Sequence, residues 1–204
     1  MHASVTLYLA RHGETDWNAA GRWQGQTDVD LNERGRAQAR ELAVLARALG
    51  VAAVAASDLL RARSTAEIVA AELGLAVGRL HPDLRERRFG CFEGLTREEV
   101  AARHPDAWAR YLEDPGPAPP GGESRDALLG RLLPALSRTA VELPAPLLVV
   151  MHGGSMRALL AGHAEGLPRP ASPAWPLHGI RNGQVWRVRL EAGRVAAASR
   201  VDGA

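Results

Sequence analysis

Short apolar runs alternate with longer amphipathic segments along most of this 204-residue chain. The apolar runs have the length of strands, whereas the longer segments carry apolar residues at helical spacing. The predicted strands are Val5–Ala10, Val51–Ser57, Ala76–Leu80 and Pro146–Met151, and the first is expected to be fully buried. Alternating strands and helices are typical of α/β domains, so we expect a three-layer α/β/α sandwich with a mainly parallel central sheet.

The predicted helices lie between and after these strands. They cover Leu31–Gly50, Asp58–Gly74, Arg97–Asp114, a segment from Ser124 to about Leu143, and Gly154–Gly166. Asp58 is expected near the N-cap of its helix, Glu123 is expected to cap the helix that follows it, and Pro134 favours a kink. The last segment, Asn182–Val201, alternates on both sides of Glu191-Ala192-Gly193 and predicts a hairpin.

The composition fits one globular domain spanning residues 1–204, with 46% hydrophobic and 24% charged residues. The breaker-rich stretch Pro115–Ser124 is interpreted as a surface loop. The single cysteine, Cys91, cannot form an internal disulfide, which favours a reducing compartment. We find no secretory signal and no run of roughly 18 apolar residues, so we expect a cytoplasmic protein without membrane contact.

All 25 basic residues are arginine, and the net charge is only +2. The arginines are scattered among acidic residues and form no basic block, which argues against nucleic-acid binding. Any anion that the protein binds must therefore be held by arginine or histidine. Arginine grips phosphate or carboxylate with a planar, bidentate fork.

Two predicted strands end in the same dipeptide. The segments "LYLARHG" and "LLVVMHGG" place His12 and His152, each followed by glycine, at the carboxyl end of a strand. Ligands of open α/β sheets bind beyond these ends, and glycine lets the backbone approach them closely. Gly153 then opens a helix whose free N–H groups favour an anion. With Arg11 adjacent to His12, this pattern predicts an anion site.

Four motifs in sequence resemble the histidine phosphatase superfamily, which also contains the cofactor-dependent phosphoglycerate mutases. They are "RHGETDWN" followed by "GRWQGQTDVDLNERGRAQA", then "SDLLRARSTAE", "LRERRFGCFEG" and "HGGSMRAL". The resemblance covers roughly Val5 to Leu160 in the family's order. It implies a phosphoglycerate mutase-like fold and a phosphoric monoester hydrolase of the histidine acid type.

The resemblance implies that His12 is the nucleophile that becomes a phosphohistidine. Attack requires a neutral ring nitrogen, and an unperturbed histidine has a pKa of about 6.5. Arg11, Arg61 and, if protonated, His152 would disfavour a further positive charge on His12. The same cations would stabilise the oxygens of the transferring phosphoryl group. Arg63, close to Arg61 in sequence, is assigned to the surface.

Glu86 matches the family's general acid, which protonates the leaving alkoxide and then deprotonates the attacking water. Its neighbours Arg85, Arg87 and Arg88 would favour its ionised form if they lay close, so we expect their side chains to point elsewhere. Glu93 is the rival acid. Further residues match or adjoin family positions that line the phosphate pocket: Asn18, Thr15, Gln24, Gly25 and Gly153. Trp23 and Trp108 are assigned to core packing.

Three functions stay open at this point. A phosphatase acting on small phosphomonoesters is favoured over a mutase primed by 2,3-bisphosphoglycerate, because Thr96–Pro120 is compact and lacks lysine. Gly154 also stands where mutases typically carry asparagine. A non-catalytic phospho-ligand binding protein is disfavoured, since the implied catalytic residues are all present.

The substrate depends on a cap expected around residues 92–124. Sugar phosphates, phosphoglycerate and its glycosides, and the ribazole phosphate of cobalamin synthesis stay open. The pattern implies neither a metal nor an organic cofactor, because the other histidines lack metal-ligand spacing. A homodimer is compatible with the resemblance.

Overall fold

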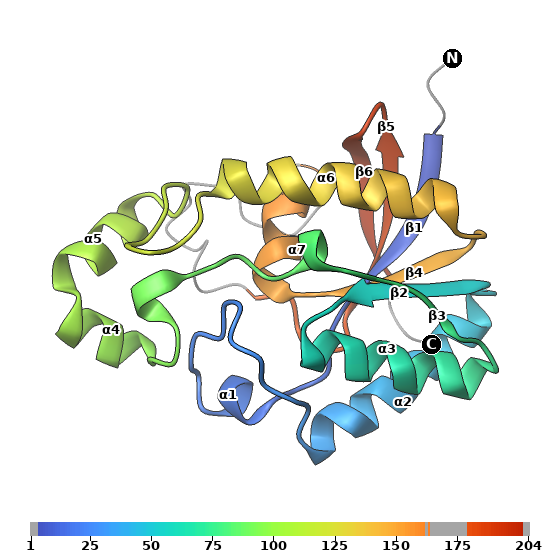
Figure 1. Cartoon of the computed structure of the whole chain (residues 1–204), viewed down its shortest axis with the longest axis horizontal. Coiled ribbons are helices and arrows are strands. Elements are labelled where there is room, and N and C mark those ends of the chain that lie inside the picture. The colour runs from blue at the N-terminus through green and yellow to red at the C-terminus, as the bar shows by residue number, and fades with distance from the viewer. Residues whose placement is uncertain (1–3, 162, 164–178, 202–204) are drawn as a thin grey trace.

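The computed structural model describes residues 4–161, 163 and 179–201 and contains a central six-stranded sheet in the order β3-β2-β4-β1-β5-β6 (Figure 1). The strands are β1 (Ser4–Arg11), β2 (Ala53–Ser57), β3 (Val77–His81), β4 (Leu147–Met151), β5 (Val185–Glu191) and β6 (Arg194–Val201). The first four run parallel, and β5 pairs antiparallel with β1 and with β6. The expected hairpin is confirmed. Ala192 and Gly193 form its turn with φ of 48° and 72°.

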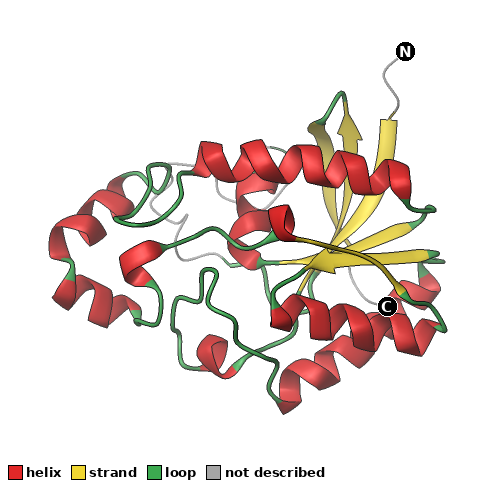
Figure 2. Ribbon diagram, in the orientation of Figure 1, coloured by secondary structure: helices red, strands yellow, loops and turns green. Residues whose placement is uncertain are grey.

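Helices cover both faces of the sheet, as Figure 2 shows. On one face α2 (Glu33–Ala48) and α3 (Leu60–Leu73) pack against alternate strand residues such as Ala10 and Val150. On the other face α6 (Arg125–Glu142) and α7 (Gly153–Leu160) pack against the intervening residues, such as Leu9 and Val149. Because strand side chains alternate between faces, the apolar runs fill both cores. The three-layer α/β/α fold is confirmed.

The remaining elements lie at the carboxyl end of the sheet or beyond it (Figure 1). They are α1 (Asp16–Ala19), α4 (Arg97–Arg103), α5 (Pro105–Glu113), and the 3₁₀ turns η1 (Pro82–Leu84) and η2 (Gly90–Phe92). A separate aromatic cluster ties α5 to the loops beside it. It consists of Trp23, Phe89, Phe92, Trp108 and Tyr111. Both tryptophans therefore pack as expected. No helix in the described ranges is long and apolar enough to cross a membrane.

Several local predictions are wrong. The helix predicted over Arg97–Asp114 is two helices separated at His104, because Pro105 disfavours helical geometry in the residue before it. Leu59, not Asp58, occupies the N-cap of α3 and makes no side-chain cap. The Asp58 carboxylate is instead paired with Arg85, at 2.6 and 2.7 Å.

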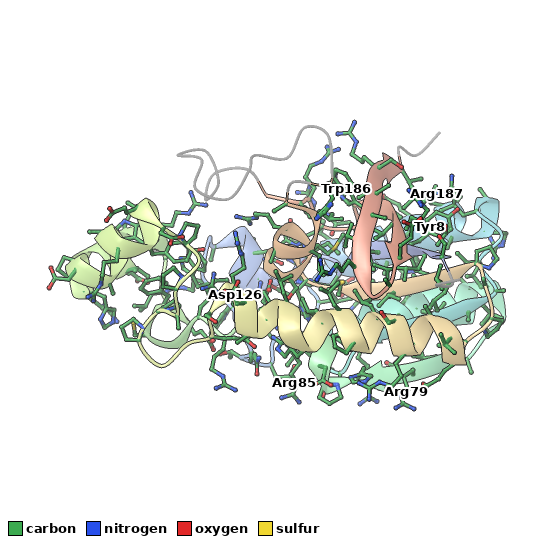
Figure 3. All side chains as sticks on the ribbon, turned by 90° about the horizontal axis from the view of Figure 1, so that it is seen from above. Tyr8, Arg79, Arg85, Asp126, Trp186 and Arg187 are labelled. Carbon is green, nitrogen blue, oxygen red and sulfur yellow. The ribbon has the colours of Figure 1, made fainter. Side chains whose placement is uncertain are left out.

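One further cap and one strand also differ from the predictions. Ser124, not Glu123, caps α6 by accepting from the amide of Ala127. Pro134 lies inside α6, which continues on both sides of it. The strand β1 is not fully buried. Its Tyr8 is half-buried opposite exposed Arg187 of β5, and Figure 3 shows the two close together. The last part of the helix predicted to Gly166 lies outside the described residues.

Candidate active site

The two His-Gly pairs meet at the carboxyl edge of the sheet. The sheet register pairs Arg11 of β1 with Met151 of β4. The residue that follows each of these is a histidine, so His12 and His152 lie side by side. The His12 amide donates to the Met151 carbonyl at 3.0 Å, and the two imidazole rings lie 5.2 Å apart between centroids. Both rings are buried. Adjacent parallel strands thus bring together two residues that are 140 positions apart in the sequence.

The geometry of His12 fixes its tautomer. Its Nδ1 lies 2.6 Å from the carbonyl oxygen of Gly13, which only accepts, so Nδ1 carries the proton and Nε2 keeps a lone pair. Burial, followed by the charges of Arg61 and Arg11, lowers the pKa of His12 well below 6.5. His12 is therefore neutral, with one nitrogen available as a nucleophile. Glycine is required beside it, because a Cβ on Gly13 would lie 2.3 Å from the carbonyl oxygen of Gly35.

His152 is neutral as well. Burial, Arg61, His12 and Arg11 lower its pKa well below 6.5, so a protonated His152 does not contribute to keeping His12 neutral. Within the described part of the chain, neither ring nitrogen of His152 has a hydrogen-bond partner, although both are buried. Buried polar atoms normally have partners, so this ring is poised for a ligand that supplies one.

Arg11 and Arg61 place positive charge beside the histidines. The Arg11 guanidinium donates to the carbonyl of Ile180 at 2.6 Å, and Arg61 donates to those of Gly25 and Thr27 at 2.7 and 2.9 Å. The Nε of each arginine is buried without a partner among the described residues. Burial lowers the pKa of both to about 10, so both stay charged near neutral pH.

Glu86 lies in the same site, where its charge counteracts the fall in the pKa values of both arginines. The side chains of Arg85 and Arg87, which flank it in sequence, are bound elsewhere, as expected. Arg85 pairs with Asp58 and lies at the periphery in Figure 3, and Arg87 donates to four backbone carbonyls of the loop before α6. Neither of these two guanidinium groups therefore hydrogen-bonds to the Glu86 carboxylate.

A cavity of about 200 Å³ opens between these groups. Its lining contains most of the predicted site residues. It is formed by Arg11, His12, Asn18, Gly21, Arg22, Trp23, Gln24, Gly25, Arg61, Glu86, Phe89, Arg97, Gly153, Gly154 and Arg157. A larger hollow of about 840 Å³ lies between α2 and residues 179–185, but of the predicted site residues it contains only Arg11.

Some predicted residues take other positions. Thr15 is fully buried, and its hydroxyl accepts from the amide of Asn18 to cap α1, so it serves the loop that carries Asn18. His152 is fully buried and is not among the residues of the described cavity lining. Glu93, the rival acid, accepts from the Phe89 amide at 2.8 Å and the Thr27 hydroxyl at 3.2 Å, outside the described cavity lining. The structure thus favours Glu86 as the acid.

The sequence interpretation missed Arg157, Asn182 and the position of Arg97. Arg157 lies four residues after Gly153 on α7. This spacing puts both residues on one face of the helix and is the sequence feature that could have predicted Arg157 in the site. Asn182 donates to the carbonyl of His12 and to the Asn18 side chain, at 3.0 and 3.2 Å. No local pattern marks this residue. In the described ranges we find no cluster of three acidic, histidine or cysteine side chains suited to a metal ion.

A neutral histidine with a free nitrogen, two buried arginines and a carboxylic acid are the kinds of group that phosphoryl transfer through a histidine requires. The comparisons identify the family. A model of the histidine phosphatase superfamily (branch 1) matches residues 7–202, and the chain belongs to this family.

Two plant relatives come from Arabidopsis thaliana. The chain is 42% identical over 161 residues to a metal-independent phosphoserine phosphatase, covering 75% of this chain and 66% of that protein. It is 39% identical over 157 residues to phosphoglycerate mutase-like protein 4, covering 75% and 68%. The chain thus spans about two thirds of these relatives' length. A solved structure of mycobacterial glucosyl-3-phosphoglycerate phosphatase with VO3 matches with a TM-score of 0.76 and 33% identity over 90% of each chain.

Proposed function

We propose that this chain hydrolyses small phosphomonoesters through a phosphohistidine on His12. The observation that carries this proposal is the state of His12, which is neutral, held by Gly13 at Nδ1, and part of the lining of the cavity that Arg11 and Arg61 also line. Relatives named as phosphatases support the same reaction.

In the first step His12 Nε2 attacks phosphorus, and the bond from phosphorus to the substrate's alcohol oxygen breaks. The electron pair of that bond goes to the leaving oxygen, which takes a proton from Glu86. Arg11 and Arg61 stabilise the equatorial oxygens, where charge must be matched in the transition state. In the second step water attacks phosphorus, Glu86 takes its proton, and His12 leaves with the electron pair of the nitrogen–phosphorus bond.

The acid-type character of this phosphatase is part of the proposal. Because the pKa of His12 lies well below 6.5, the nucleophile stays unprotonated in mildly acidic solution. Residues 92–124 form the cap that selects the substrate within a single domain. We also propose that the reaction needs no metal, which the relative named as a metal-independent phosphoserine phosphatase supports, and that the enzyme acts in the cytoplasm; a homodimer is compatible with this proposal.

Phosphorus NMR tests the reaction. Wild type receives 3-phosphoglycerate, with and without 2,3-bisphosphoglycerate, together with a panel of phosphomonoesters. The catalytic variant is His12→Ala, and the matched control is His163→Ala, which alters an exposed histidine. We expect free phosphate from wild type and the control, and none from His12→Ala.

Two other results would replace the proposal. Bisphosphate-dependent formation of 2-phosphoglycerate would identify a mutase. Binding of inorganic phosphate without turnover of any panel member would identify a phospho-ligand binding protein.

A further inference from the structure

The Glu86 carboxylate is held by three donors that are divided unequally between its oxygens. Oε1 accepts from the amide of Arg87 and from the hydroxyl of Ser155, each at 2.8 Å. Oε2 accepts from the amide of Gly154 at 2.8 Å. Each carboxylate oxygen has two lone-pair positions. Among the described residues, Oε1 is therefore filled, whereas Oε2 keeps one position open.

The three donors differ in whether they can turn away. The amides of Arg87 and Gly154 belong to the backbone and only donate. The Ser155 hydroxyl rotates, and its second neighbour is the Arg85 carbonyl at 3.2 Å. Its single hydrogen serves the nearer acceptor, Glu86 Oε1. Ser155 is fully buried and lies at the start of α7, so bulk solvent does not compete for this hydrogen.

The donors suggest an assignment of the two oxygens. Glu86 and Gly154, which donates to Oε2, line the cavity. Ser155 and Arg87, which donate to Oε1, are outside the described lining. We therefore assign Oε2 to the cavity side and Oε1 to the protein side.

We propose that Ser155 is a positioning residue that confines the transferable proton of Glu86 to Oε2. This inference rests on the proposed function. By filling Oε1, the hydroxyl leaves only the open position of Oε2 for a proton. That oxygen gives the proton to the leaving alkoxide in the first step and takes one from water in the second. Without the hydroxyl, Oε1 gains an open position on the protein side, where a proton cannot reach substrate.

The defect expected from removing this hydroxyl depends on the leaving group. An alkyl alkoxide needs a proton to depart, whereas nitrophenolate does not. General acid catalysis typically contributes about 10²–10⁴-fold to the rate. If part of the Glu86 population carries its proton on Oε1 instead of Oε2, that part of the catalytic effect is lost. For Ser155→Ala we expect kcat/KM to fall about 10-fold or more for alkyl phosphates and to change less than about 2-fold for nitrophenyl phosphate.

The experiment measures kcat/KM, which reports the step that releases the alcohol, across aryl and alkyl phosphates. The variants are Ser155→Ala, Ser155→Thr, which keeps the hydroxyl, and Ser64→Ala as control. Ser64 is also a buried serine that donates to a carboxylate, Asp30 at 2.9 Å, outside the described cavity lining. We expect a steeper dependence on the leaving group only for Ser155→Ala.

A double variant separates positioning from a purely structural role. Once Glu86→Gln has removed the acid, adding Ser155→Ala should not steepen the leaving-group dependence further. Equal losses for aryl and alkyl phosphates, or no loss for either, would overturn the proposal for Ser155.

Trapping of wild type in an alkaline denaturing quench, with nitrophenyl phosphate labelled at phosphorus, distinguishes the two hypotheses, because phosphohistidine is stable to alkali. If no phosphohistidine forms on His12, the proposed function itself fails. If it forms and Ser155→Ala still shows parallel losses, only the positioning role fails.

Discussion

Mild acid should destabilise this protein through two buried histidines. His12 and His152 are 2% and 0% exposed, and the pKa of each lies well below 6.5, chiefly because of burial and then the charge of Arg61. In the unfolded chain both should titrate near 6.5. Below that pH the unfolded state binds protons that the folded state does not, so stability falls as pH falls.

The magnitude follows from the proton balance. A histidine that stays neutral in the fold and titrates at about 6.5 when unfolded loses about 2 kcal/mol of stability between pH 8 and pH 5. The two together would remove about 4 kcal/mol, a large part of a typical 5–15 kcal/mol. Carboxylates with lowered pKa, such as Asp30 and Glu123, stabilise the fold above their unfolded pKa. Their contribution is lost at lower pH, mostly below this window.

Urea unfolding, followed by tryptophan fluorescence in phosphate-free buffers from pH 5 to 8, measures this dependence. His152→Asn should lose about half of it, and the exposed-site control His163→Asn should keep all of it. A wild-type change below about 1 kcal/mol would refute the assignment of two neutral buried histidines. If His152→Asn kept the pH dependence of wild type, His152 would not be a neutral buried histidine.

Two other substitutions test the surroundings of Glu86, each with a control in α6. A Cβ on Gly154 would lie 2.8 and 2.9 Å from the Glu86 oxygens, so Gly154→Ala should lower kcat/KM for alkyl phosphates by about 10²-fold through misplacement of the acid. Gly130→Ala, with open space around it, should keep activity and stabilise α6 by about 0.5–1 kcal/mol, as thermal unfolding would show. Arg131 donates to the Glu86 carbonyl and to the Glu123 carboxylate, so Arg131→Gln should cost about 3 kcal/mol in urea unfolding. Arg138→Gln, which removes an exposed cation 3.9 Å from a carboxylate, should cost less than about 1 kcal/mol; equal costs would contradict the role of Arg131.

The position of the histidine pair could be predicted because its causes are local and general. Apolar runs set β1 and β4, and parallel strands bring their carboxyl ends to one edge of a sheet. A histidine after each run must then lie near that edge. Neither fact needs information from distant residues, which is why the sequence alone predicts the positions of His12 and His152.

The caps and partners could not be predicted because each carboxylate has a competing arginine partner that only the folded structure brings within reach, 27 positions away for Asp58 and 8 for Glu123. Asp58 has the right type and position to cap α3, yet Arg85 takes its carboxylate. Glu123 likewise precedes α6, but the Arg131 guanidinium binds both of its oxygens. Each carboxylate could accept from the backbone amides at the start of the helix or from an arginine. The charge-assisted hydrogen bonds to arginine are stronger, so they form instead of the cap.

The partners of the arginines explain how the site keeps its charge. Outside the site, arginines such as Arg63 and Arg85 pair with carboxylates, which cancel their charge locally. Arg11 and Arg61 instead donate to backbone carbonyls, which satisfy N–H groups without neutralising the cation. Burying such charges is costly, as their lowered pKa values record. A phosphate dianion relieves this cost by supplying the missing negative charge, so the free site is held in a state that favours the phosphoryl group.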